Sequence, residues 1–220
     1  MDQEYILHSW EFFQHDDLKL DLIERNPQNP FPLHTHDLSE LVIVLSGTGI
    51  HFTYDDEYRI APGDVFHIES GFAHGYKETR KLHLYSMFFD TSLLSRGLMD
   101  IIRMPGYHSI FHVEPKYREN HRFSSRLQLT DFQMSSVTAL INELRRELTV
   151  TSQEVGSKAM ALALFIELIV TLSRCYGSDE QKQHREICTL SRVPRFYRRT
   201  QSHIDIPRSS YHAATGKLVL

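Results

Sequence analysis

The sequence predicts a β-rich domain followed by an antiparallel pair of C-terminal helices, and two observations support this. Up to about residue 90, short apolar segments alternate with turn residues and no helical pattern lies between them, which favours an antiparallel barrel or sandwich over a βαβ fold. From about residue 132, apolar residues recur every three or four positions, as in amphipathic helices. We therefore expect a barrel with an N-terminal arm over residues 1–115, a helical region over 116–177, and a linker with a basic tail over 178–220.

Composition excludes several classes of protein. The 24 Lys and Arg residues against 28 Asp and Glu give a net charge of −4, so no basic excess indicates nucleic acid or an anionic membrane as a partner of the whole chain. Cys175 and Cys188 lie outside any zinc or redox spacing, and the first residues lack the pattern of a signal peptide. The most apolar run, 159–172, is shorter than a membrane span and contains Glu167. We expect a cytoplasmic protein without a membrane segment.

The first half contains apolar and β-branched segments divided by turns. Gly47 to Gly49 is expected to break one strand, and Ala61 to Asp64 forms a turn. The expected strands are Tyr5–Phe13, Leu18–Ile23, Leu41–Leu45, Ile50–Tyr54 paired with Tyr58–Ile60 as a hairpin, Val65–Ile68 and Leu82–Phe89.

The second half contains helical patterns. A helix is expected over Thr91–Ile102, a strand or irregular link over Ser109–Val113, an amphipathic helix over Phe132–Leu148, and a second long helix over Glu154–Tyr176 with Gly177 as its stop signal. The last helix is apolar around most of its circumference, so it needs a second surface to bury against. That surface is either a second subunit or this chain's own barrel. The residues predicted to form a dimer contact are Leu162, Phe165, Ile166 and Ile169.

From residue 178 onward, charged and polar residues dominate and apolar periodicity is weak. We interpret this part as a linker and a solvated or disordered basic tail, because no DNA-recognition helix can be drawn in it.

The segment from Pro32 to Gly47 contains the polar residues most indicative of a site. At a period of two, His34, His36 and Glu40 share one face of an extended segment, and Val42 and Val44 continue it. Because the segment that follows is apolar on both faces, we expect it to be buried on both sides. Polar side chains inside a barrel need partners, a metal or a ligand.

Two motifs carry a resemblance to the cupin superfamily. The first is His-x-His-x3-Glu-x6-Gly, from His34 to Gly47, and the second is Gly-x5-Glu-x-Gly-x2-His, from Gly63 to His74. The resemblance implies a double-stranded β-helix, or jelly-roll, barrel in which one divalent metal is held by His34, His36, Glu40 and His74. The sequence departs from the family pattern at Gln28, Glu69 and Glu78, all outside the four ligand positions.

Three imidazoles and one carboxylate suit Zn, Ni, Fe or Mn and leave coordination positions open. This set of ligands does not choose among those metals. The alternative is that the four groups hydrogen-bond one another and a bound ligand without a metal.

The wider arrangement resembles the effector-binding half of AraC/XylS-type transcriptional regulators, in the branch that controls L-rhamnose and related sugar operons. The resemblance covers about residues 18–185 and includes the segment Met104–Pro115, Arg126–Leu129, and two helices ending near Arg174. It implies a barrel that binds a sugar or other small effector, helices that form a homodimer, and a linker to a DNA-binding domain with two helix-turn-helix units. That last domain is not found in this sequence, where 190–193 and 202–207 resemble its distorted start. We expect no specific operator binding by this chain alone.

Two main functional hypotheses follow, and a third remains open. As a binding module without catalytic residues, the barrel takes a polyol effector that contacts some of His34, His36, Glu40, His74, Tyr76, Tyr54 and Phe66, with residues 1–17 as a closing arm. For each aromatic residue, ordinary barrel packing is the alternative. As an enzyme, a metal-dependent dioxygenase or sugar isomerase, the same four ligands hold a catalytic ion. That hypothesis leaves the helices and the tail unexplained. The third is a dimeric scaffold with an empty barrel.

Overall fold

The computed structural model describes residues 5–8, 18–95, 100–113 and 127–187. The chain divides into two units, residues 1–182 and 183–220, and only the end of one helix is described in the second. The predicted tail from residue 188, most of the expected N-terminal arm and residues 116–126 lie outside the described residues.

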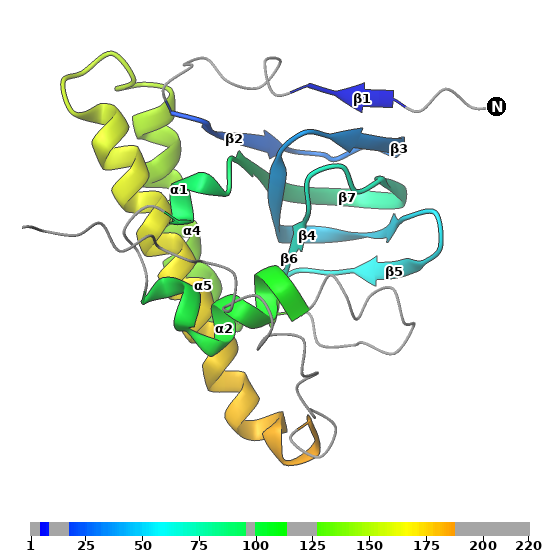
Figure 1. The fold of residues 1–220 in the computed structure, drawn as a ribbon. Helices are drawn as coiled ribbons and strands as arrows, with labels where there is room; N and C mark the ends of the chain where they lie inside the picture. Colours follow the sequence, from blue (N-terminus) through cyan, green and yellow to red (C-terminus); the bar gives the residue numbers. More distant parts are fainter. Residues whose placement is uncertain (1–4, 9–17, 96–99, 114–126, 188–220) are drawn as a thin grey trace, which may run out of the picture. The chain divides into compact units, whose positions relative to one another are not determined.

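The described strands form one eight-stranded sheet, in the order β1-β3-β7-β4-β6-β8, with β2 also paired to β7 and β5 to β4 (Figure 1). Strands β4 and β7 are antiparallel along their whole length, from Ser39 opposite Phe89 to Phe52 opposite Gly75. The strands are β1 (Tyr5–Leu7), β2 (Leu20–Arg25), β3 (Phe31–His36), β4 (Ser39–Phe52), β5 (Glu57–Ile60), β6 (Asp64–Ile68), β7 (His74–Phe89) and β8 (Leu127–Gln128). The expected hairpin is confirmed, with Phe52 opposite Glu57 and Gly49 opposite Ile60.

The helices lie between and after the strands. They are α1 (Ser92–Ser95), the 3₁₀ turn η2 (Ile101–Arg103), α2 (Pro105–His108), the π-helical turn η3 (Ser109–Val113), α4 (Asp131–Leu148) and α5 (Ser157–Ile187). Helix α4 agrees with its prediction and begins with a capping box, in which the Thr130 hydroxyl accepts a hydrogen bond from Gln133 N and the Gln133 side chain accepts one from Thr130 N.

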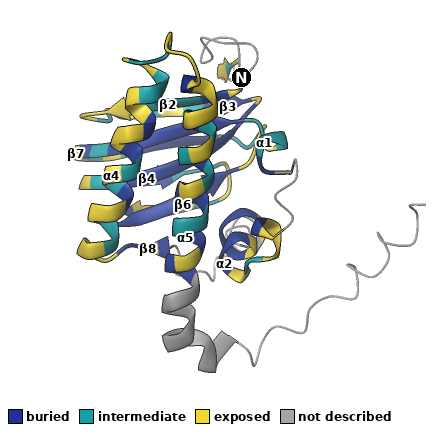
Figure 2. Cartoon of the chain, turned by 90° about the vertical axis from the view of Figure 1, so that its left-hand side faces the viewer, coloured by how far each residue is buried: buried dark blue, intermediate teal, exposed yellow. Residues whose placement is uncertain are grey.

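The two faces of the sheet have different cores. The inner face carries Val42, Val44 and Phe66 with other buried residues, whereas Leu41, Ile43 and the rest of the larger core lie on the opposite face. Helices α4 and α5 lie side by side over that second face (Figure 2). Residues 41–44 are fully buried, as the apolar pattern predicted, because the strand interior contacts side chains on both sides. The sheet and the two helices therefore share one core, while the domain boundaries at residues 115 and 177 stay predictions.

Strand β4 does not end at the glycines, contrary to the sequence prediction. It continues to Phe52, with three shifts of register against β7 between Val44 and Ile50. Gly47 has a φ of 75°, and a Cβ there would lie 2.1 Å from the Lys81 carbonyl oxygen. The glycine therefore lets the strand bulge rather than stop.

The predictions for the helical half are only partly correct. Within the expected helix over 91–102 the structure describes α1 and the 3₁₀ turn η2, and residues 96–99 lie outside the described residues. The segment Ser109–Val113 is a π-helical turn rather than a strand. Helix α5 begins at Ser157 and continues through Gly177 to Ile187. A glycine inside a helix costs only about 1 kcal/mol, and the Glu, Gln and Lys residues that follow favour helix.

Candidate metal centre and effector site

Three strands supply the four predicted ligands. His34 and His36 lie on β3, Glu40 near the start of β4, and His74 at the start of β7. A turn at residues 37–38 separates β3 from β4, so the single extended segment expected from the sequence is two strands. The four residues still meet, because β3 and β4 both pair with β7 and His34 lies opposite His74. All four are almost fully buried.

One carboxylate oxygen joins two of the histidines. Glu40 Oε2 lies 3.0 Å from His36 Nε2 and 3.3 Å from His74 Nε2. One ligand atom from each of these three residues lies within 4.8 Å of the others, close enough to share a metal ion. His34 is outside this set of three, although its ring centroid is 4.2 Å from that of His74.

The backbone fixes the orientation of all three imidazoles. Nδ1 of His34 lies 3.1 Å from the Pro32 carbonyl oxygen, Nδ1 of His36 2.6 Å from that of Leu38, and Nδ1 of His74 3.2 Å from that of Phe72. A carbonyl only accepts, so each Nδ1 carries the hydrogen and donates it. Each Nε2 is then the nitrogen left for a proton or a metal, which is the arrangement typical of metal-ligating histidines.

The charges in the cluster favour a cation. Burial alone would raise the pKa of Glu40, but the hydrogen bond from His36 and the neighbouring His74 imidazole outweigh it and hold the pKa well below its ordinary value. Burial also opposes charge on His36, yet its hydrogen bond to Glu40 raises the pKa of that imidazole. Burial and the neighbouring His74 lower the pKa of His34 to about 4. At neutral pH a buried carboxylate therefore faces imidazole nitrogens, and this donor set fits a divalent metal.

A fifth histidine, His51 on β4, extends the cluster and was missed by the sequence analysis. It is fully buried, and its ring stacks on His74 at 5.3 Å with an interplanar angle of 22°. Strict alternation from Val42 would place it on the opposite face. The register shifts after Val44 reverse the alternation, so the two glycines at 47 and 49 were the signal for this residue.

The structure separates the predicted effector aromatics. Phe66 and Tyr76 are buried on the inner face, and their rings lie 5.0 and 5.3 Å from that of His51. Tyr54 is 69% exposed and lies in the turn between β4 and β5, so it is not part of the buried inner face, and its contact with an effector stays a prediction. The Thr53 hydroxyl accepts hydrogen bonds from the backbone of residues 55 and 56, which closes this turn on the outside of the sheet.

The predicted dimer residues also divide into two groups. Phe165 and Ile169 are fully buried in this chain's own core, with the Phe165 ring 5.1 Å from that of Phe89. They cover the sheet and are not available to a partner, which corrects their assignment to a dimer surface. Leu162 and Ile166 are partly exposed and pack at the edge of the same core.

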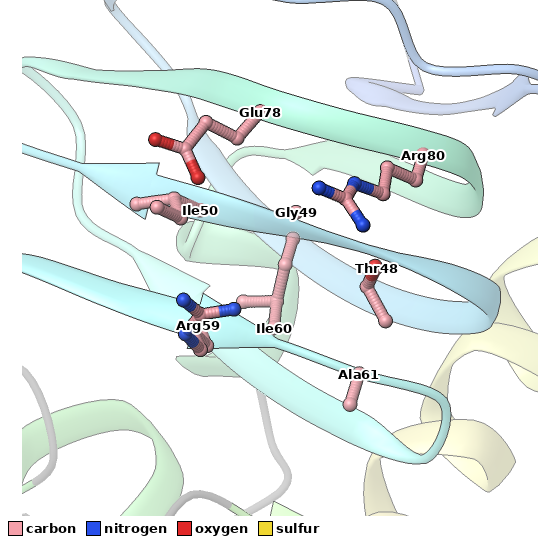
Figure 3. A pocket seen from close by; sticks show the side chains of 8 residues that line it. All are labelled: Thr48, Gly49, Ile50, Arg59, Ile60, Ala61, Glu78 and Arg80. Carbon is pink, nitrogen blue, oxygen red and sulfur yellow. The ribbon is translucent and has the colours of Figure 1, made fainter.

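A groove of about 230 Å³ lies away from the cluster, between β4, β5 and β7. Figure 3 shows Glu78 and Arg80 on one side and Arg59 on the other, with Gly49 and Ile50 between them. None of the predicted site residues lines this groove, which makes it a control surface for binding experiments.

One described helix, over Ser157–Tyr176, is long and apolar enough to cross a membrane by length and composition. Its buried residues pack against the sheet in the core shared with α4. That packing accounts for its apolar character as a core helix.

Comparison with known proteins agrees with this geometry. The cupin domain family model matches residues 22–88, which include all four candidate ligands. The HTH-type transcriptional activator RhaR of Mannheimia succiniciproducens is 28% identical over 179 residues, 81% of this chain and 59% of that protein. RhaR of Escherichia coli O139:H28 is 33% identical over 171 residues, 77% of this chain and 56% of that protein.

The chain carries a cupin domain and is a relative of the RhaR regulators. This confirms the resemblance to the effector-binding region of AraC/XylS-type regulators. The chain spans less than two thirds of the length of these relatives, which are named as transcriptional activators rather than enzymes.

Two solved structures show distant similarity to this cupin domain chain. A cupin-2 domain protein from Shewanella frigidimarina is 20% identical with a TM-score of 0.29, covering 36% of this chain and 76% of that one. The AraC-like transcriptional activator CuxR is 13% identical with a TM-score of 0.35, covering 61% and 42%. The family match and the sheet topology, rather than these similarities, establish the cupin fold.

Proposed function

We propose that this chain is the ligand-sensing part of a cytoplasmic bacterial transcriptional regulator and not an enzyme. The observation that carries the proposal is the buried cluster of His36, Glu40 and His74 inside a cupin domain whose relatives are transcriptional activators. The ligand is a small polyol such as the deoxyhexose rhamnose. A polyol suits an interior where histidine and carboxylate groups meet flat aromatic faces.

In this proposal a divalent metal, Zn, Ni, Fe or Mn, is held by His36, Glu40 and His74, with His34 beside them. The ion would supply a positive centre that binds and orients sugar hydroxyl oxygens. The protein itself contributes the fixed Nε2 atoms, the buried carboxylate and the exclusion of water. Phe66 and Tyr76 supply the apolar wall next to them.

The N-terminal strand β1 pairs with the strand that carries His34 and His36, so in this proposal ligand binding changes the position of β1. Strand β1 runs parallel to β3, with Tyr5 opposite His34 and Leu7 opposite His36. Leu7 also packs against Leu38 and Phe88. A ligand that moves β3 changes the surface on which β1 lies, and it shifts the arm only if it binds one arrangement better than the other.

The output of sensing is a change in a homodimer. The partly exposed face of α5, with Leu162 and Ile166, is the proposed contact between copies. A separate DNA-binding domain would then be repositioned.

The metal and the ligand are tested separately. Elemental analysis of protein purified without added metal should find a transition metal in the parent and none in the His36→Ala variant. Thermal unfolding with deoxyhexoses and pentoses should show at least one sugar that raises the midpoint, because a ligand that binds only the native state stabilises it. If no sugar does so, and turnover appears with added iron and oxygen, the enzyme hypothesis replaces this one.

A further inference from the structure

We propose that His51 is a positioning residue for the candidate metal centre: its ring stacks on His74 and keeps that imidazole with Nε2 directed at Glu40. The inference rests on the proposed metal site and assigns a role to a residue outside the ligand set. His51 lies on β4, directly opposite Tyr58 of β5 and Tyr76 of β7.

His74 needs more than its hydrogen bond to hold its ring plane. The bond from Nδ1 to the Phe72 carbonyl oxygen is 3.2 Å long, at the long end of the usual range, so on its own it restrains the ring only weakly. Four rings surround His74: His34 at 4.2 Å, His36 at 5.1 Å, His51 at 5.3 Å and Tyr76 at 6.2 Å. Of these, His51 is the one most nearly parallel to His74, at 22°, against 52° to 89° for the others. With these neighbours in place, His74 Nε2 lies 3.3 Å from Glu40 Oε2.

His51 is itself held in place by three other aromatic rings that pack around it. The centroids of Tyr58, Phe66 and Tyr76 lie 4.9, 5.0 and 5.3 Å from that of His51. Close packing of this kind lets a side chain transmit a fixed orientation to its neighbour, because no space remains for it to swing away. Groups that orient metal ligands in this way typically affect metal affinity by about 10- to 100-fold.

The inference depends on the shape of the His51 ring and not on its nitrogens. Phenylalanine keeps a flat ring at position 51 and has no nitrogen. Alanine removes the ring and leaves space into which His74 can turn. Ile60 provides the matched control, since it is buried in the same inner core and Ile60→Ala also creates a cavity.

The experiment is a titration of the full chain with Co²⁺, followed by visible absorption and by calorimetry. We expect the parent and His51→Phe to bind with the same absorption bands and closely similar affinity. His51→Ala should bind at least about tenfold more weakly, with altered bands. Ile60→Ala should lose thermal stability but keep the parent's Co²⁺ affinity.

Each other result overturns the inference in a recognisable way. Parent-like affinity in His51→Ala refutes the positioning role and leaves the metal site intact. Equal loss in His51→Phe and His51→Ala shows that a nitrogen, and not the ring, is what matters. A parent that binds no Co²⁺ refutes both the metal site and this inference. If His51→Ala does not fold, His51→Leu fills the space without a flat ring, and parent-like affinity in that variant also overturns the proposal.

Discussion

Glu40 and His36 are joined by a hydrogen bond of 3.0 Å between Oε2 and Nε2, although a turn separates their two strands. The same carboxylate oxygen reaches His74 at 3.3 Å from a third strand. Three strands of the cupin sheet are therefore linked through one buried carboxylate. This relationship makes Glu40 the residue whose replacement should have the widest effect.

Replacing Glu40 with glutamine should abolish tight metal binding and destabilise the fold. The amide keeps the shape of the side chain but removes its negative charge. His36 and His74 then lose their carboxylate neighbour, which in the parent raises the pKa of His36. Breaking a buried ion pair costs about 3–5 kcal/mol. The cost is smaller at a pH where His36 is neutral, because the pair then carries only the carboxylate charge. Calorimetry with Zn²⁺ and urea unfolding measure the two effects. Glu69→Gln, in an exposed turn, is the control, and equal behaviour of the two variants would contradict the prediction.

The metal-free protein should lose stability as the pH falls from about 6.5 to 4, in part because of His34. The pKa of His34 is about 4 in the folded protein, against an ordinary value of 6.5. Over that interval the unfolded chain binds the proton and the folded chain does not, so unfolding is favoured as pH falls. The full difference corresponds to about 3 kcal/mol. Above pH 6.5 this contribution is constant.

The His34→Gln variant isolates this effect from the other members of the cluster. Its free energy of unfolding should fall less steeply than that of the parent between pH 6.5 and 4, as measured by urea unfolding at each pH. Parallel curves for parent and variant would show that His34 titrates normally in the folded protein.

Two positions on α5 that differ in exposure should respond differently to substitution. Ile166→Glu, at a partly exposed position, should leave a folded protein whose mass by light scattering falls from dimer to monomer. Phe165→Ala on the buried side should instead cost about 3–5 kcal/mol, because it leaves a cavity against Phe89. A folded Ile166→Glu variant that remains a dimer would show that α5 is not the contact between copies.

Gly47→Ala should destabilise the protein more than Gly71→Ala. Both glycines have positive φ, 75° and 76°, so both variants carry a similar backbone strain of about 1 kcal/mol. At Gly47 the new Cβ would also lie 2.1 Å from the Lys81 carbonyl oxygen, whereas at Gly71 nothing lies within 4 Å. Thermal unfolding of the two variants measures the difference, and equal midpoints would mean that β4 relaxes at the bulge.

Local patterns predicted much of the cupin domain and part of its site. Alternation grouped His34, His36 and Glu40, the resemblance to the cupin motifs added His74, and alternation along 41–44 assigned the two buried faces of β4. The apolar stripe over 132–148 also predicted α4 correctly. These features depend on residues close in sequence, where period and capping rules act.

The missed features depend on contacts between distant residues. His51 faces the interior only because β4 bulges against β7. A strict period of two, which is all that the sequence shows, would place His51 on the other face. Apolar periodicity showed that α5 needs two surfaces, but it did not show which side meets the sheet. Phe165 and Ile169 were therefore assigned to a partner, although they cover Phe89 and its neighbours.

The most direct test of the sensing role is calorimetric titration of a stabilising sugar into the parent, Glu40→Gln and Arg80→Ala, each at the same concentration of added metal. Arg80 lines the groove between β4, β5 and β7, which contains none of the cluster residues. The parent and Arg80→Ala should bind the sugar equally, while Glu40→Gln should bind at least about tenfold more weakly, a difference of about 1.4 kcal/mol. Parent-like binding by Glu40→Gln together with a loss in Arg80→Ala would contradict the account and place the ligand in the groove.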